Sequence, residues 1–94
     1  MNKQPMKEIL VKVYGNVQGV FFRRYAEEKA VECKVTGFAK NEEDGTVEIV
    51  AQGPEENLRH YLNFISTGPE GAEVESINVQ WGPAGETITG FTTT

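Results

Sequence analysis

The chain of 94 residues carries nine basic and fourteen acidic side chains, a net charge of −5 and a pI of about 4.8. This length supports one hydrophobic core, so we expect a single domain over residues 1–94, with residues 1–6 as a loose N-terminal tail. The acidic balance disfavours a nucleic-acid partner, because proteins bind polyanions through clustered Lys and Arg. No apolar run approaches the roughly 18 residues that a membrane-spanning helix needs, so we expect no membrane partner.

The cysteine content and the spacing of possible metal ligands indicate the compartment of the protein and whether it binds a metal. Cys33 is the only cysteine, so it cannot form an internal disulfide, and the first residues show no apolar leader core. We therefore expect a cytoplasmic protein. No group of His, Cys, Asp and Glu has the spacing of a metal site, so we expect neither metal nor cofactor, and we expect a monomer.

The first element in chain order is a strand predicted over residues 7–14, where apolar residues alternate with a mixed set. A glycine-bearing loop follows. Residues 22–33 then place aromatic and small side chains at steps of three and four, which predicts a helix. A second strand is predicted over residues 35–40 and a third over 46–52, joined by a turn at Asp44-Gly45.

The second half of the chain begins with Pro54, which is tolerated in a first helical turn and is followed by Glu55 and Glu56. A helix is predicted from there to a stop at Gly68. A further strand carries Ile77, Val79 and Trp81 in alternation, while Val74 is out of phase and indicates a bulge or a late entry into pairing. Residues 88–91 are a candidate for a short last strand.

The order β-α-β-β-α-β predicts an α+β fold, the split βαβ or ferredoxin-like sandwich, with two helices on one face of an antiparallel sheet. In this topology the first two strands are parallel, with the third strand between them. The loop after the first strand and Asn41 after the second therefore lie at the same edge, about 9 to 10 Å apart.

The loop at residues 15–21 is the strongest candidate site. The first N–H groups of a helix lack partners and its dipole favours negative charge, so a loop that leads into a helix can bind an anion. Arg23 and Arg24 follow it, where the dipole alone disfavours cations. A surface role explains Arg23 equally well from its residue type, and the loop lacks the Gly-Lys-Ser/Thr ending of a nucleotide-binding P-loop.

The other candidate residues have simpler interpretations. Asn41 is explained by hydrogen bonds to its own turn, unless its place opposite Arg23 gives it a ligand. The only histidine, His60, is expected on the polar side of its helix, and Cys33 in the core. Glu42, Glu43 and Asp44 crowd the edge of the candidate site and are expected to repel an anionic substrate.

Two stretches resemble one family. Residues 15–23, Gly-Asn-Val-Gln-Gly-Val-Phe-Phe-Arg, resemble the acylphosphatase motif Gly-x-Val-Gln-Gly-Val-x-Phe-Arg. Residues 37–41 and 44–48 resemble the second motif of that family, Gly-aromatic-x-basic-Asn followed by Asp-Gly-x-Val-Glu. Asn16 departs from the family, because a basic residue is frequent at its position.

The resemblance implies a hydrolase acting on acid anhydrides. It would cleave small acyl phosphates by metal-independent attack of water, with inorganic phosphate as product and inhibitor. It further implies that Arg23 and Asn41 are catalytic and that loop amides bind the phosphate, namely those of Asn16, Val17, Gln18, Gly19, Val20 and Phe21. The alternative is a non-catalytic anion-binding or interaction module, because one fold serves many functions.

Overall fold

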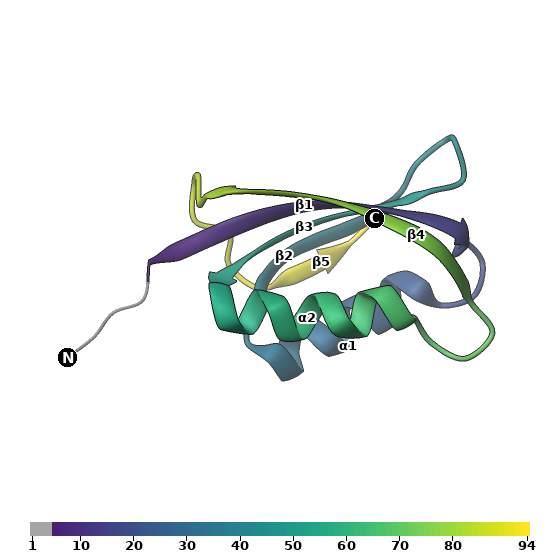
Figure 1. Ribbon diagram of the computed structural model, residues 1–94, viewed down its shortest axis with the longest axis horizontal. Helices are drawn as coiled ribbons and strands as arrows, with labels where there is room; N and C mark the ends of the chain where they lie inside the picture. Colours follow the sequence, from purple (N-terminus) through teal and green to yellow (C-terminus); the bar gives the residue numbers. More distant parts are fainter. Residues whose placement is uncertain (1–4) are drawn as a thin grey trace.

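The computed structural model of the protein describes residues 5–94. Five strands form one sheet: β1 (Met6–Asn16), β2 (Thr36–Asn41), β3 (Val47–Pro54), β4 (Glu73–Pro83) and β5 (Phe91–Thr93). Helix α1 (Phe22–Cys33) and helix α2 (Glu55–Thr67) both cover the same face of this sheet (Figure 1). The predicted α+β sandwich is therefore confirmed.

The core lies between the sheet and the two helices. Strand β1 turns Ile9, Val11 and Val13 into it, all of them fully buried, while Leu10 and Tyr14 lie on the opposite, open face. This is the two-residue alternation of a strand with one covered face. The helices add the buried side chains of Phe22, Ala26, Ala30, Leu58, Tyr61 and Ile65, which recur at the period of a helix.

The strand order is β4-β1-β3-β2-β5. Because β3 pairs antiparallel with both β1 and β2, those two strands run parallel to each other, as the predicted topology requires. Val47 of β3 lies opposite Val13 on one side and Asn41 on the other. Asn41 is thus in register with the last part of β1, close to the point where the loop begins.

Strand β1 continues two residues beyond its predicted end. Gly15 and Asn16, assigned to the loop from the sequence, pair with β4 beyond a register shift between Tyr14 and Gly15. Because Tyr14 faces Ser76 and Gly15 faces Val74, Glu75 is the additional residue of a bulge, which confirms the irregularity predicted near Val74. A Cβ atom at Gly15 would lie 2.0 Å from the Glu73 carbonyl oxygen, so only glycine fits there.

The short strand predicted over residues 88–91 is wrong in position. The strand β5 that does form pairs in parallel with β2, and Gly37 N–H donates to the Gly90 carbonyl oxygen at its start (2.9 Å). The amide of Ile88 donates instead to Oε1 of Gln52 (2.9 Å), so a side chain uses the group that strand pairing would need.

Strand β1 begins inside the predicted N-terminal tail of residues 1–6. Residues 1–4 of the predicted tail lie outside the described residues, whereas Met6 is already paired with Pro54 in β1.

Neither helix that the structure describes has the length and apolar character required to cross a bilayer.

Candidate active site

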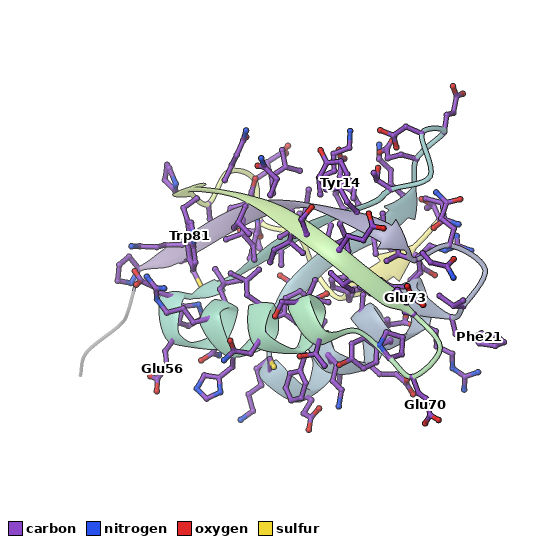
Figure 2. All side chains as sticks on the ribbon, turned by 45° about the vertical axis from the view of Figure 1, so that its right-hand side comes forward. Tyr14, Phe21, Glu56, Glu70, Glu73 and Trp81 are labelled. Atoms are coloured by element: carbon purple, nitrogen blue, oxygen red, sulfur yellow. The ribbon has the colours of Figure 1, made fainter. Side chains whose placement is uncertain are left out.

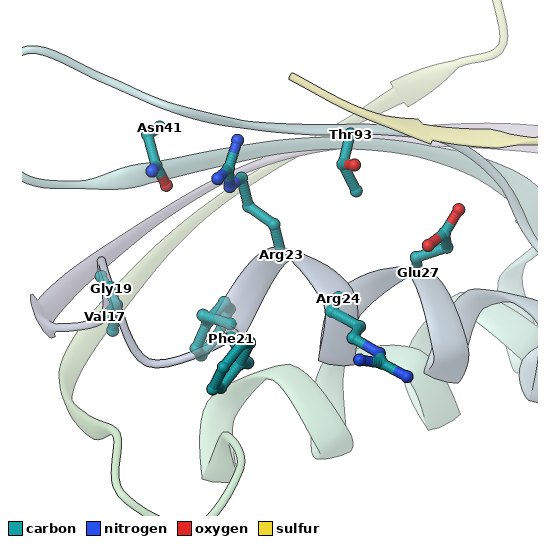
Figure 3. A pocket seen from close by; sticks show the side chains of 9 residues that line it. Val17, Gly19, Phe21, Arg23, Arg24, Glu27, Asn41 and Thr93 are labelled. Carbon is teal, nitrogen blue, oxygen red and sulfur yellow. The ribbon is translucent and has the colours of Figure 1, made fainter.

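A cavity of about 440 Å³ opens at the end of the sheet where β1 and β2 finish. Four elements line it: the loop after β1, the first turns of α1, the last residue of β2, and β5 (Figure 3). The lining residues are Val17, Gly19, Phe21, Phe22, Arg23, Arg24, Glu27, Asn41 and Thr93. The sequence-based expectation that the loop, Arg23 and Asn41 meet at one edge agrees with this geometry.

The loop offers backbone donors. Gly19 and Phe21 have left-handed backbone conformations, with φ of 73° and 60°. Helix α1 begins without a side-chain cap, and Phe21 supplies the first carbonyl oxygen, to which Tyr25 N–H donates (3.0 Å). Within residues 5–94, no amide of residues 17–21 donates to a protein acceptor. Amides in this position at a helix start are suited to binding an anion.

The six residues predicted to supply amides have different surroundings. Val17, Gly19 and Phe21 line the cavity. Asn16 is the last residue of β1 and is paired with Glu73, and Val20 packs against the core. The contact of each amide with a phosphate stays a prediction.

The side chain of Gln18 has a role that sequence reasoning missed. Its Nε2 donates to the carbonyl oxygens of Glu42 (2.8 Å) and Thr46 (2.9 Å), which flank the turn after Asn41. Both hydrogens of one amide group therefore join the loop to the β2–β3 hairpin. No periodic pattern in the sequence predicts such a contact, because both acceptors are backbone atoms more than twenty residues away.

Arg23 points from α1 toward Asn41, whereas Arg24 turns away from both (Figure 3). One guanidinium nitrogen of Arg23, Nη1, donates to the Thr94 carbonyl oxygen. Thr94 is held in turn, because its N–H donates to the Ala39 carbonyl oxygen of β2 (3.0 Å). The segment that includes β5 thus orients Arg23, a contribution that the sequence did not predict.

The side chain of Asn41 is exposed, and among the described residues it makes no hydrogen bond. The turn after it is closed by other groups: Glu42 N–H donates to the Thr46 carbonyl oxygen (2.8 Å), and Asp44 Oδ1 accepts from the Thr46 hydroxyl (2.5 Å). The simpler interpretation, that Asn41 stabilises its own turn, therefore does not describe this structure. Its amide group is available to a ligand.

The acidic side chains beside the site are partly neutralised. Asp44 Oδ2 lies 2.9 Å from Lys12 Nζ, and Glu42 Oε1 lies 3.5 Å from Lys40 Nζ. The hydrogen bonds from the Thr46 hydroxyl and from Lys12 hold the pKa of Asp44 well below its usual range. Two of the three acids expected to repel an anionic substrate therefore have a lysine beside them.

The remaining titratable candidates lie elsewhere. His60 is exposed on α2, and Glu55 is bound by Lys7 Nζ (2.6 Å) and by Arg59 Nε (2.9 Å) at the start of that helix. Cys33 is partly buried against the core, and burial raises the pKa of its thiol. In the part of the chain that the structure describes, no group of three or more His, Cys, Asp or Glu side chains could hold a metal.

An arginine and amides without a protein acceptor lie at one end of a split βαβ sandwich, which defines a small α+β domain with a candidate anion site. The family model for acylphosphatase matches residues 9–93. The chain therefore belongs to the acylphosphatase family.

Individual relatives agree with this assignment. An acylphosphatase from Thermus thermophilus is 46% identical over 77 residues, which are 82% of this chain and 88% of the relative. The crystal structure of acylphosphatase from Bacillus subtilis superimposes with a TM-score of 0.91 at 33% identity, covering 94% of this chain and 98% of that one. An acylphosphatase structure from Coxiella burnetii matches all of both chains, with 35% identity and a TM-score of 0.85.

Proposed function

We infer that the protein is an acylphosphatase, which hydrolyses the carboxyl–phosphate bond of a small acyl phosphate to a carboxylate and inorganic phosphate. One observation carries this inference: Arg23 and Asn41 line the same cavity as a loop whose amides have no protein acceptor among the described residues. Membership of the acylphosphatase family supports the same reaction.

The chemistry needs little help from an acid. The leaving carboxylate is a weak base, because carboxylic acids have a pKa of about 4 to 5, so protonating it gains little. The remaining task is to hold the phosphoryl group, neutralise charge on its oxygens and place water behind it. Positioning and electrostatic stabilisation of this kind are what amides, an arginine and an asparagine can provide.

Each residue then has a defined role. The amides of residues 16–21 and the guanidinium of Arg23 bind the phosphoryl oxygens, and the Asn41 side chain orients water opposite the leaving oxygen. The water oxygen forms its bond to phosphorus as the phosphorus–acyl oxygen bond breaks. The water proton passes to a phosphoryl oxygen, which completes the products without a protein base.

The decisive experiment compares Arg23→Ala with Arg24→Ala on acetyl phosphate. We expect Arg23→Ala to lower kcat/KM at least about 100-fold, because one change removes a charge and a fork of donors, and phosphate binding should weaken with it. Arg24 also lines the cavity, but its side chain turns away from Arg23 and Asn41 (Figure 3), so Arg24→Ala should change kcat/KM by less than about threefold. Turnover retained in Arg23→Ala would refute the assignment.

The proposal extends to metals and partners. Activity should persist in excess chelator, inorganic phosphate should inhibit competitively, and light scattering should show a monomer. The net charge of −5 supports the absence of a nucleic-acid partner. We also propose a cytoplasmic location. A non-catalytic anion-binding module would bind phosphate and leave acetyl phosphate intact, so the wild-type assay alone separates the two functions.

A further inference from the structure

Glu27 is an acidic residue in a cavity that is otherwise suited to an anion. Among the described residues that line the cavity it is the only acid, and it is partly buried there. Other acids at this end of the molecule, such as Glu70 and Glu73, are exposed and do not line the cavity (Figure 2). A carboxylate in this place opposes the binding of phosphate, so phosphate binding does not explain Glu27.

The charge of Glu27 is not neutralised by a neighbouring side chain. Within residues 5–94 its carboxylate takes part in no ion pair. Arg24 precedes it by three residues on α1, but the two side chains point in different directions (Figure 3). Arg23 donates instead to the Thr94 carbonyl oxygen. The Glu27 carboxylate is therefore available to a ligand in the cavity.

Glu27 lies one helical turn beyond Arg23. Residues four apart on a helix are neighbours, with Cβ atoms about 5 to 6 Å apart. Figure 3 shows Arg23 between Asn41 and Glu27. In an in-line reaction, the water that Asn41 holds approaches phosphorus from one side, and the leaving group departs on the other side. An acyl group whose phosphate is bound at Arg23 therefore extends along the cavity toward Glu27.

We propose that Glu27 selects substrates by the charge of the acyl group: it favours acyl phosphates whose acyl chain carries an amino group and disfavours those with a second carboxylate. This inference rests on the proposed function and adds a substrate preference to it. An ammonium group can donate a charge-assisted hydrogen bond to Glu27, whereas a carboxylate is repelled. Because Glu27 is only partly buried, solvent weakens both effects, and each should change affinity about twofold to fivefold. Glu27 is thus a specificity residue, whereas Arg23 serves every substrate.

The test measures binding of two stable phosphonates by calorimetry, 3-aminopropylphosphonate and 3-phosphonopropionate, in wild type and in Glu27→Gln. Glutamine keeps the size and the helix propensity of glutamate and removes only its charge. The ratio of the two affinities, amino over carboxylate, should fall about fivefold in Glu27→Gln. The ratio cancels any effect of the lost charge on the phosphonate group, which both ligands share. Glu27→Lys reverses the charge and should lower the ratio further.

Three controls make the result specific. Glu28→Gln removes the same charge from the next residue of α1, which is exposed and outside the cavity lining, and should leave the ratio unchanged. High salt should lower the ratio in wild type more than in Glu27→Gln, because salt screens charges. Thermal unfolding of each variant checks that the fold is intact. An unchanged ratio in Glu27→Gln, or an equal fall in Glu28→Gln, would overturn the proposal.

Turnover measurements separate this proposal from the proposed function. The value of kcat/KM for succinyl phosphate relative to acetyl phosphate should rise about twofold to fivefold in Glu27→Gln, because only the first substrate carries a second carboxylate. If the wild type hydrolysed neither substrate and the phosphonate ratio still depended on Glu27, the reaction would be wrong and the subsite right. If it hydrolysed both and neither ratio changed in Glu27→Gln, the reaction would stand and the subsite would fall.

Discussion

The two ends of the sheet use the same kinds of polar group in opposite ways. At the end that carries the candidate site, the amides of residues 17–21 and the Asn41 side chain have no hydrogen-bond partner among the described residues. At the other end Gln52, only 2% exposed, is fully engaged. Its Nε2 donates to Glu8 Oε1 (2.8 Å) and to the Glu86 carbonyl oxygen (2.7 Å), and its Oε1 accepts from Ile88 N–H.

The difference shows what distinguishes a binding site from a structural junction in a small domain. Gln52 binds the connection that leads from β4 to β5, and its partners come from the chain itself. The site end lacks such partners within the described protein, so solvent or a ligand supplies them. Changes at the two ends should therefore affect different quantities: activity at the first end and stability at the second.

The largest expected effect is that of Asn41→Ala at the site end. The variant loses the group that we propose orients water, so kcat on acetyl phosphate should fall about 100-fold or more, while inorganic phosphate should still bind with nearly wild-type affinity. Steady-state kinetics with phosphate as inhibitor measures both quantities. Loss of phosphate binding would assign Asn41 to gripping the anion instead of placing water.

At the opposite end, Gln52→Leu should cost stability and spare the chemistry. Leucine leaves the Glu86 carbonyl oxygen and the Ile88 amide without their partner, which should lower the free energy of unfolding by about 2 kcal/mol. Urea unfolding measures this change. Gln80→Leu, at an exposed position of β4, is the matched control and should change stability by less than about 0.5 kcal/mol.

The kinetics of Gln52→Leu decide whether the two ends are independent. Below its unfolding range the variant should keep kcat on acetyl phosphate within about twofold of wild type. A larger fall in kcat would show that a shift of the connection between β4 and β5 also displaces Arg23. The two ends of the sheet would then not be independent.

A smaller effect is expected for Gln18→Met, which keeps the length of the side chain and removes both donated hydrogen bonds to the hairpin. The loop and Asn41 would no longer be held together, so kcat/KM should fall about tenfold. If Gln18 acts by positioning Asn41, the double variant with Asn41→Ala should lose little more than Asn41→Ala alone. Additive losses would show that the two side chains act independently.

The sequence predicted those parts of the molecule that depend on local pattern. Alternating Ile9, Val11 and Val13 located β1, and the order of elements placed Asn41 beside the loop. The motif match then pointed to Arg23 and Asn41, and the structure brings both to one cavity. The placement of β1 and of Asn41 is confirmed because period and topology follow from burial and chain handedness, whereas the roles of Arg23 and Asn41 stay predictions.

The sequence could not predict contacts between a side chain and a distant backbone. The partners of Gln18 lie 24 and 28 residues away, and no residue type identifies a carbonyl oxygen as an acceptor. The place of β5 depends on the hydrogen bonds of Gln52 and on parallel pairing with β2, so the apolar pattern of residues 88–91 indicated the wrong position. Three-dimensional proximity, not composition, decides both features.

The smallest expected effect concerns acid stability at the site end. Asp44 has its pKa lowered in the folded protein by the Thr46 hydroxyl and Lys12, so its ionised form stabilises the fold above its unfolded pKa of about 4. That contribution is lost as the pH falls from there through the lowered folded pKa. Asp44→Asn should therefore be less stable than wild type at pH 7, and the difference should shrink below about pH 4. Urea unfolding at both pH values measures the difference. A constant difference would mean that the hydrogen bonds of Asp44 act without its charge.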